Sequence, residues 1–438
     1  MALSISRALD AAAFSLVAIA LAAAPARAQP AQPAQPAAAA AKPIKIGIVT
    51  FLSGAAAGPF GVPARNGAEL IVEALNNGTV PAPYATKGFG GAPIELVFLD
   101  EAGGTTKQVS EYRDLVQRQN VDLVIGYISS GDCLAVAPVA EELKKLTVFF
   151  DCGSPRILED ASFKHVFRSA GHATMDSVGA ALYVTEMKPG LKKFAGINQN
   201  YAWGQDSWND FEAAVKALKP GVEVTTSQMP KLLAGQYGAE ISALLNGAPE
   251  VIHSSLWGGD LEAFVLQAGP RGVFEKRTVV LAAGETAMSR LGTRIPDGTV
   301  IGARGPHGIY APDNELNRWL RKAFQDRYAV AATYPTYHMA QALLGLKTAY
   351  EKAGPNPSQD KVIAAFENAT FETPSGTIRM ALAKGHQAIE ETVYGTTKTV
   401  NGQVTVVNVK RYPAATVNPP DGIKSQEWIK TSLKRASR

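Results

Sequence analysis

The stretch Val121-Asp-Leu-Val-Ile-Gly-Tyr-Ile-Ser-Ser-Gly131 shows the pattern that decides the fold. An apolar run of strand length leads into aromatic, hydroxyl and glycine residues, and a helical pattern follows. Three further stretches repeat this arrangement, at 146–155, 194–204 and 278–286. In open α/β sheets, ligands bind just beyond the carboxyl ends of the strands. The pattern therefore predicts a site for a small polar molecule at these strand ends, and none of the four ends forms a recognisable catalytic set.

Strand-length runs alternate with helical patterns along most of the chain. The first run, 44–49, precedes a helix that Pro63 opens and whose apolar residues recur at helical spacing. This alternation predicts an α/β fold with a parallel sheet covered on both faces. A second series of the same kind extends from 175 to 282. We therefore expect two doubly wound lobes with a cleft between them.

The last third of the chain breaks the alternation. Three helical patterns follow one another, at 314–328, 336–353 and 359–368, before short extended pieces. The simplest account is that the chain returns to complete both lobes. We expect three crossings between the lobes, near 166–170, 300–306 and 380–388. The predicted lobes are 44–167 plus 303–384, and 168–302 plus 385–438.

The N-terminus is typical of an exported protein. Arg7 precedes an apolar run from Ala11 to Ala24, and Ala26-Arg27-Ala28 supplies small residues for a signal peptidase. The run is shorter than the ~20 residues that a membrane-spanning helix needs, which disfavours an anchor. We predict a signal peptide at 1–28, a Pro/Ala-rich linker at 29–43 and a periplasmic location.

Composition excludes several classes of function. The chain has 438 residues, more than one ordinary core accommodates, and a formal charge of +4. It has no dense Lys/Arg stripe, so we expect no nucleic-acid partner. The six histidines show no ligand spacing, and nucleophile-elbow, dinucleotide and phosphate-loop motifs are absent. We expect no metal, no cofactor and no enzymatic activity.

The two cysteines, Cys133 and Cys152, lie just past adjacent strand ends. An oxidising compartment permits a disulfide between them. Two free, half-buried thiols are the alternative, because the distance between the two Cα atoms cannot be derived from the sequence.

Residues 44 to about 412 resemble the periplasmic solute-binding proteins of ABC importers, of the branched-chain amino acid (leucine/isoleucine/valine-binding) type. The stretches that carry the resemblance are 45–54, 66–69, 136–143, 201–204, 284–287, 374–378 and 385–388. Their order and spacing, more than any single motif, make the match. The resemblance implies the type I periplasmic binding fold, in which three hinge crossings join the two lobes.

The resemblance also implies a ligand site. Its expected residues are Phe60, Ser130, Gly131, Cys152, Gly153, Ser154, Tyr201, Trp203, Trp257 and Glu285. In that family an aromatic residue of the first loop lines the pocket, and hydroxyl and N–H groups after the third and fourth strands hold a carboxylate. A second-lobe aromatic, matched by Trp203, closes over the ligand, and an acidic residue, matched by Glu285, pairs with an α-ammonium group.

Elementary chemistry agrees with these roles and also offers plainer ones. Free N–H groups at helix N-termini favour anions, yet serines there are also common helix caps. Glu285 can bind an ammonium group, but an acid in a first helical turn is stabilised by the helix dipole anyway. The aromatic residues offer flat apolar area for a ligand or for the core. Two departures from the family pattern, Cys152 and Trp203, indicate a side-chain pocket different from that for leucine.

The sequence thus predicts an exported, monomeric receptor that captures a small carboxylate-bearing solute by hinge closure and delivers it to an ABC-transporter permease. An amino acid of the branched-chain type is the favoured solute. Aromatic carboxylates, short amides or urea are alternatives within the same fold. A periplasmic sensor that transports nothing is an alternative function.

Overall fold

The computed structural model of the chain describes residues 42–436. The predicted signal peptide and nearly all of the predicted linker lie outside the described residues. Within 42–436, no helix combines the length and the apolar character needed to cross a membrane.

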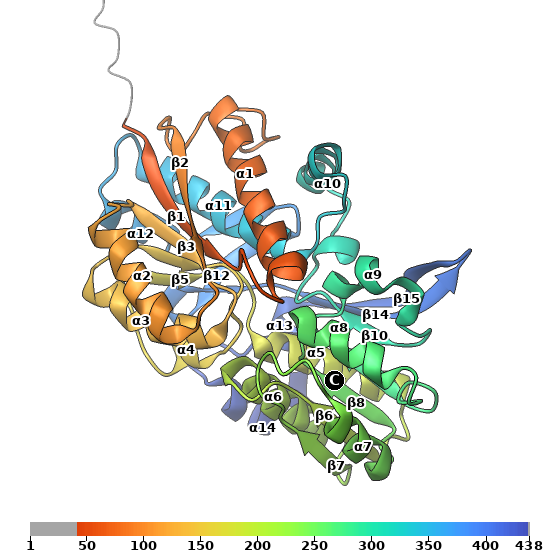
Figure 1. Cartoon of the computed structure of the whole chain (residues 1–438). Coiled ribbons are helices and arrows are strands. Elements are labelled where there is room, and N and C mark those ends of the chain that lie inside the picture. The colour runs from red at the N-terminus through yellow and green to blue at the C-terminus, as the bar shows by residue number, and fades with distance from the viewer. Residues whose placement is uncertain (1–41, 437–438) are drawn as a thin grey trace, which may run out of the picture. The chain divides into compact units, whose positions relative to one another are not determined.

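Two mostly parallel sheets organise the described chain (Figure 1). The first has the strand order β11-β12-β13-β5-β4-β3-β1-β2, and the second has the order β15-β14-β10-β9-β8-β6-β7. We call the first sheet with its helices the first lobe and the second sheet with its helices the second lobe. The strands of the first sheet are β1 (Ile44–Thr50), β2 (Ile94–Asp100), β3 (Leu123–Gly126), β4 (Thr147–Phe149), β5 (Val166–Arg168), β11 (Thr370–Thr373), β12 (Gly376–Leu382) and β13 (Gln387–Ile389). Those of the second are β6 (Lys193–Ile197), β7 (Glu223–Gln228), β8 (Val251–Ser254), β9 (Thr278–Leu281), β10 (Val300–Gly302), β14 (Thr392–Val400) and β15 (Gln403–Tyr412).

Helices cover the sheets and connect parallel strands. In chain order they are α1 (Val62–Asn77), α2 (Thr105–Gln117), α3 (Ser130–Glu142), α4 (Arg156–Glu159), α5 (Ala173–Met187), α6 (Ala202–Leu218), α7 (Gly238–Gly247), α8 (Gly258–Ala268), α9 (Glu285–Leu291), α10 (Glu315–Tyr328), α11 (Tyr334–Ala353), α12 (Gln359–Phe366), α13 (Ala414–Val417) and α14 (Ser425–Ala436). A π-helix, η1 (Ala57–Gly61), precedes α1. Short 3-10 turns are η2 (Gly292–Arg294), η3 (Gly308–Tyr310) and η4 (Ala383–Gly385).

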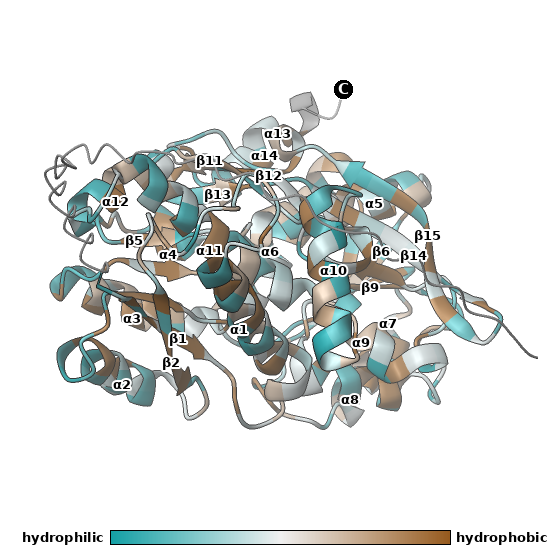
Figure 2. Cartoon of the chain, turned by 90° about the horizontal axis from the view of Figure 1, so that it is seen from above, coloured by the Kyte–Doolittle hydropathy of each residue, from teal (hydrophilic) through white to brown (hydrophobic). Residues whose placement is uncertain are grey.

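Local sequence explains these elements. Helix α1 buries its stripe Ala64, Ala68, Ile71 and Leu75, as its periodicity predicts, and ends at Gly78 in the left-handed conformation. Strand β3 is buried along its whole length, as expected for a strand with helices on both faces. Figure 2 shows hydrophobic strands such as β1 and β2, while the outer helices α2 and α10 carry hydrophilic turns.

The chain crosses between the lobes three times: after β5, after β10 and after β13. The third crossing lies beyond Ile389, whereas the sequence placed it near 380–388, with the first lobe ending at 384. The pattern at 383–385 is instead the turn η4 inside the first sheet, where Lys384 has a positive φ of 59°. Strand β13 then pairs with both β12 and β5. A turn and a crossing have the same local composition, so only strand pairing separates them.

Candidate ligand-binding cleft

A small cavity lies between the lobes at the carboxyl ends of the central strands. Its lining comprises Phe60, Ile128, Asp151, Gly153, Tyr201, Trp203, Trp257, Ala283, Arg304 and Tyr334. The cavity has a volume of about 10 Å³, about the space that one water molecule needs. The described structure is therefore a closed form in which side chains fill the cleft.

Aromatic rings from both lobes meet in this cavity. The Phe60 ring lies 5.1 Å from that of Trp257 and 5.4 Å from that of Tyr334, edge to face in both pairs. The Trp257 Nε1 donates to the Tyr201 hydroxyl at 2.8 Å. Edge-to-face packing of this kind stabilises apolar contact, so closure buries these rings against one another.

Arg304 supplies a fixed positive charge to the cavity. It follows β10 at the second crossing, and 5% of its side chain is exposed. Its Nη1 lies 2.5 Å from Asp151 Oδ1 and its Nε 3.3 Å from Asp176 Oδ2. Burial lowers the pKa of Arg304, but the two carboxylates outweigh this effect and hold it above its ordinary value. The guanidinium also lies over the Trp203 ring, 4.5 Å from the centroid.

Several predicted site residues shape the loop after β4 instead of lining the cavity. The Ser130 Oγ accepts from the N–H groups of Gly153 and Ser154, both at 3.1 Å. The Ser154 Oγ donates to Asp206 in the second lobe at 2.5 Å. The structure joins Cys152 to Cys133 in the disulfide that the sequence allowed. The N–H groups expected to hold a ligand carboxylate at this loop therefore already have a partner.

Gly153 is the member of this loop that faces the cleft. A Cβ atom added there would lie 2.4 Å from the Trp203 ring and 2.7 Å from Arg304 Nη2. Any side chain at this position would displace one of them. The absence of a side chain thus lets the cationic and aromatic groups approach the first lobe.

Glu285 is the first residue of α9, and it is not part of the cavity lining. Its Oε2 accepts from the backbone N–H of Tyr334 at 3.1 Å, which joins the second lobe to helix α11 of the first. Burial raises the pKa of Glu285 to about 7, although backbone N–H groups of Tyr334 and Ile309 lower it. A further bond between the lobes links the Gly259 N–H to the Ala55 carbonyl at 3.1 Å. Glu285 therefore helps to hold the lobes closed.

Half of the residues predicted for the site line the cavity. These are Phe60, Gly153, Tyr201, Trp203 and Trp257. Ser130, Gly131, Cys152, Ser154 and Glu285 lie around it without lining it. The sequence missed Ile128, Asp151, Ala283, Arg304 and Tyr334. Four of them lie two residues past the end of a strand and so carried a usable positional signal: Ile128, Asp151, Ala283 and Arg304. Tyr334 begins a late helix and carried none.

A buried polar cluster ties the crossings together beside the cavity. His307, His338 and Glu390 each bring one potential metal-ligand atom to within 4.8 Å of the others. The sequence predicted no metal site, because these residues are far apart in the chain. All three already have partners: His338 contacts Asp151, His307 contacts Ser375, and Glu390 accepts from the Gly171 N–H at 2.8 Å and from Gln341. The cluster therefore joins the second crossing to the third, and the His307 Nε2, 3.4 Å from Glu390 Oε2, forms no hydrogen bond with a described residue.

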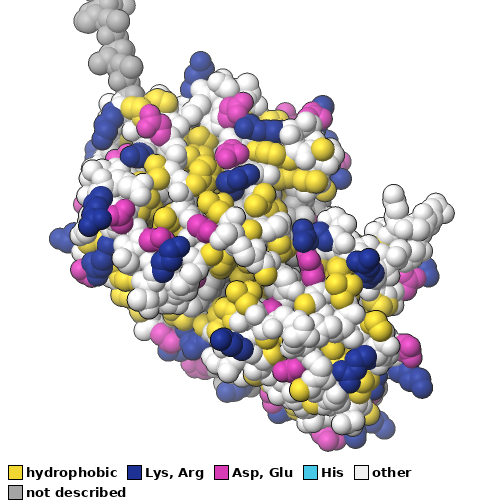
Figure 3. All heavy atoms as spheres, in the orientation of Figure 1, with side chains coloured by type: hydrophobic (Ala, Val, Ile, Leu, Met, Phe, Trp, Pro, Cys, Tyr) yellow, Lys and Arg dark blue, Asp and Glu magenta, His cyan; other side chains and the backbone are white. Residues whose placement is uncertain are grey.

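Charges on the protein surface are mixed in sign. Figure 3 shows Lys/Arg and Asp/Glu side chains interspersed over the face drawn, with hydrophobic side chains gathering between the two lobes. This distribution agrees with the expectation of a small ligand held between lobes, because no broad single-sign patch occupies this face.

Known proteins share this two-lobed architecture. A family model described as periplasmic binding protein matches residues 43–401. Among curated proteins, none matches the sequence. A solute-binding protein of an ABC transporter from R. palustris, solved with benzoate, has a TM-score of 0.74 at 20% identity, over 87% of this chain and 99% of that one. Another from R. palustris, with 4-hydroxybenzoate, has a TM-score of 0.74 at 18% identity, over 85% and 98%. A leucine-binding protein from Thermotoga maritima has a TM-score of 0.71 at 18% identity, over 84% and 98%. These likenesses confirm the predicted two-lobed α/β fold.

Proposed function

This chain belongs to the periplasmic binding protein family, and from that premise we propose that it captures a small aromatic carboxylate between its lobes and delivers it to the permease of an ABC transporter. Family membership makes it a binding protein and not an enzyme, as the sequence predicted. The sequence favoured a branched-chain amino acid and kept aromatic carboxylates as an alternative. We reverse that order of preference because of the side chains that line the cleft.

One observation carries the proposal: a buried guanidinium, Arg304, shares the cavity with five aromatic side chains. A benzoate-like ligand has an aromatic ring and a single anionic group, and this lining offers a partner for each. The residue predicted to bind an α-ammonium group, Glu285, is directed at the Tyr334 N–H instead. An aromatic acid has no ammonium group and needs no such residue.

Ligand entry requires the lobes to open, and this changes the ion pairs of Arg304. Arg304 is held by Asp151 of the first lobe and by Asp176 of the second. Opening the lobes separates these two carboxylates, so Arg304 must release one of them. We propose that the Asp151 carboxylate occupies the place of a ligand carboxylate when the cleft is empty. Ligand binding then exchanges one carboxylate for another at the same guanidinium.

Two solved structures support this ligand class, since benzoate and 4-hydroxybenzoate are bound to those proteins. An amino acid is the second candidate, favoured by one feature of the cavity. The Asp151 Oδ2 is buried without a hydrogen-bond partner among the described residues, and an ammonium group could bind there. The two candidates differ in the role of Asp151. An aromatic acid replaces the Asp151 carboxylate at Arg304, whereas an amino acid leaves that ion pair in place and binds Asp151 through its ammonium group.

A thermal-shift screen of the mature protein distinguishes them. The panel contains benzoate, 4-hydroxybenzoate, leucine, other amino acids, short amides and urea. A ligand at 100 times its Kd adds about 2.7 kcal/mol to the free energy of unfolding, which raises the Tm measurably. We expect the aromatic acids to raise the Tm and the amino acids to leave it unchanged. A response to amino acids alone would overturn the proposed ligand class.

Benzamide is the matched control ligand, because it keeps the ring and replaces the carboxylate by a neutral amide. We expect benzoate to bind at least tenfold more tightly than benzamide in calorimetric titrations, the scale of one charged hydrogen bond. Equal affinities would show that Arg304 does not bind the anion. Uptake of labelled benzoate by cells with and without this gene tests delivery to a permease and separates transport from sensing.

A further inference from the structure

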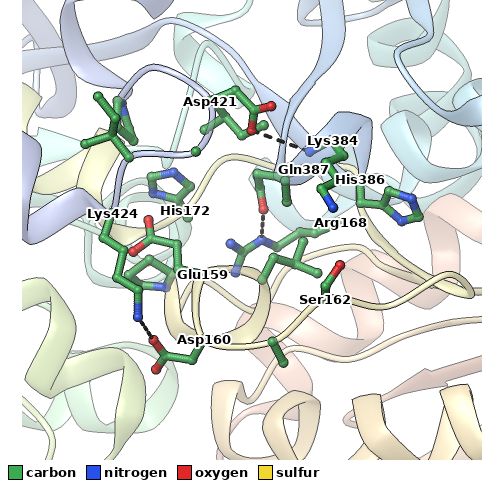
Figure 4. A pocket seen from close by; sticks show the side chains of 18 of the residues that line it. Glu159, Asp160, Ser162, Arg168, His172, Lys384, His386, Gln387, Asp421 and Lys424 are labelled. Atoms are coloured by element: carbon green, nitrogen blue, oxygen red, sulfur yellow. Dashed lines mark hydrogen bonds and ion pairs between the residues drawn. The ribbon is translucent and has the colours of Figure 1, made fainter.

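A second pocket lies on the hinge side of the molecule, behind the loop that lines the cleft (Figure 4). Its volume is about 460 Å³, within the usual range of small-molecule sites. Its walls come from the first lobe at 155–163 and 382–387, from the first crossing at 168–172, and from the segment 419–424 before α14. The pocket is therefore shared by the first lobe, the hinge and the C-terminal part of the chain.

The floor of this pocket holds a buried cation without a carboxylate partner. Arg168 is 1% exposed and forms no ion pair with any carboxylate between residues 42 and 436. Its Nε donates to Gln387, and its Nη1 donates to the carbonyls of Cys152 and Ser154 at 3.1 and 2.7 Å. Its Nη2 has no hydrogen bond to a described residue. Burial lowers the pKa of Arg168, and the charges of Glu159 and Asp206 oppose this effect without forming an ion pair with it. Buried charges in proteins are normally paired, so this guanidinium lacks an anion in direct contact.

A second unsatisfied group stands next to it. His172 is 1% exposed, and both of its ring nitrogens lack a hydrogen-bond partner among the described residues. Burial, followed by the nearby charges of Arg168 and Arg304, lowers the pKa of His172 well below its ordinary value, so the ring is neutral at pH 7 and keeps one N–H to donate. In Figure 4 the side chains of Arg168 and His172 point toward the same central space.

The acidic side chains of the pocket are engaged elsewhere. Both Glu159 oxygens accept bonds from Ser425, and Asp160 pairs with the Lys424 Nζ at 2.6 Å. Asp421 accepts a long bond from the Lys384 backbone N–H. The remaining walls are largely apolar and include Leu158, Phe163, Leu382 and Ile423. An occupant that fits has one anionic group for the floor and a small apolar body for the walls.

We propose that this hinge-side pocket is a second ligand site, separate from the cleft, that takes a small organic monocarboxylate: the anion binds Arg168 and His172, and the apolar part lies against Leu158, Phe163 and Ile423. Arg168 also holds the carbonyls on either side of Gly153, whose other face touches Trp203 and Arg304 in the cleft. An occupant of the hinge-side pocket would therefore contact the same guanidinium that holds the loop 152–154.

The test counts bound 4-fluorobenzoate by equilibrium dialysis, with fluorine NMR as the second readout. Ile423 is 38% exposed at the pocket wall, so Ile423→Trp fills the pocket with little risk to folding. Val400→Trp is the matched control, because Val400 is 49% exposed at the end of β14, outside the pocket. We expect the wild type and V400W to bind two molecules and I423W to bind one. His172→Phe, which removes both ring nitrogens, should weaken the second site about tenfold.

Arg304→Gln, which removes the guanidinium of the cleft and changes no residue that lines the hinge-side pocket, separates this inference from the proposed function; Phe60→Ala replaces it where R304Q does not fold. A bound molecule that survives R304Q and is lost in I423W supports the hinge-side site, even where the cleft binds nothing. A single bound molecule that is lost in R304Q and survives I423W overturns the hinge-side site and leaves the proposed function standing. Binding of no 4-fluorobenzoate at all overturns the hinge-side site as proposed.

Discussion

Two buried arginines hold opposite sides of one loop, residues 151–155, and their surroundings differ. On the cleft side, Arg304 contacts Asp151 and Asp176, and the cavity beside it has a volume of about 10 Å³. On the hinge side, Arg168 contacts only carbonyl and amide oxygens, and the pocket beside it measures about 460 Å³. The same charge at similar burial thus goes with a filled cavity on one side and an open pocket on the other.

The difference shows that a buried arginine with a carboxylate partner in the protein is less available to a ligand than one without such a partner. An uncompensated buried charge costs several kcal/mol, so a partner within the protein makes the closed, empty cleft stable. Under the proposed function, a ligand carboxylate competes with Asp151 for Arg304. Arg168 has no such competitor in the described chain, so an anion there meets an unsatisfied donor. Each of the following experiments changes one side of this comparison.

The largest effect is expected for Arg304→Gln. This change leaves Asp151 and Asp176 buried without a cation, and removing one partner of a buried ion pair costs about 3–5 kcal/mol. Urea unfolding should show this loss in the free energy of unfolding. Arg118→Gln is the matched control, since 85% of the Arg118 side chain is exposed, and exposed pairs contribute about 0–1 kcal/mol. Equal losses in the two variants would show that the Arg304 pairs contribute no more than a surface contact.

The second effect concerns the loop that the two arginines share. Cys133 and Cys152 are 19 residues apart, and a bridge of this span stabilises a protein by about 3 kcal/mol in the chain-entropy description. The double change Cys133→Ala and Cys152→Ala should therefore lower the free energy of unfolding by about that amount. Dithiothreitol should lower the Tm of the wild type and leave that of the double variant unchanged. A wild type insensitive to the reductant under unfolding conditions would contradict the bridge.

The third effect is a pH dependence of the free energy of unfolding, caused by Glu285. Burial raises its pKa to about 7, from an ordinary value of 4.5. Below pH 4.5 the carboxyl is protonated in both folded and unfolded chains, and between these values only the folded chain keeps the proton. The wild type should therefore lose up to about 3 kcal/mol relative to Glu285→Gln as the pH rises from 4 to 8.

The measurement is the difference in unfolding free energy between these two proteins at each pH. Comparing the variant with the wild type cancels the other titrating groups, including Asp176 and Asp210, whose pKa values burial also raises to about 7. A difference that stays constant from pH 4 to 8 would mean that Glu285 titrates alike in folded and unfolded chains.

The smallest effect is expected within the aromatic wall of the cleft. Tyr201→Phe removes the acceptor of the Trp257 N–H and should weaken benzoate binding by about 1 kcal/mol, the net value of one neutral hydrogen bond. A double-mutant cycle with Trp257→Phe isolates the pair, and we expect a coupling of similar size. Additive effects of the two changes would show that the bond contributes nothing to closure.

Much of the architecture was predictable because its signals are local. The periodicity of 62–77 and the apolar run at 123–126 report burial on one face or on both, which any helix or parallel strand in such a sheet requires. The third crossing was not predictable in the same way. The turn at 383–385 has the glycine and polar residues of a crossing, and only the pairing of β13 with β5 assigns it to the first sheet.

For the candidate site, too, some features were predictable from the sequence and others were not. The family resemblance implied Phe60, Gly153, Tyr201, Trp203 and Trp257 as site residues, and these five line the cavity. The general rule that ligands bind beyond the carboxyl ends of parallel strands predicted the edge on which they lie. That rule does not say which way a side chain turns. Ser130 and Ser154 lie at the correct edge, yet their hydroxyl groups bond to the loop itself and to Asp206.

The sequence alone determined the two-lobed α/β fold and the cysteines able to bridge, and it predicted the edge of the sheets at which we expect a ligand. Only the tertiary structure decided which charges have partners. Arg304 and Asp151 are 153 residues apart. Among the described residues, Arg168 has no ion-pair partner and the His172 ring has no hydrogen-bond partner. Helical and strand periods report the environment within a few residues, whereas electrostatic pairing depends on distance in space. For this reason the chemistry of both pockets emerged only when the chain was folded.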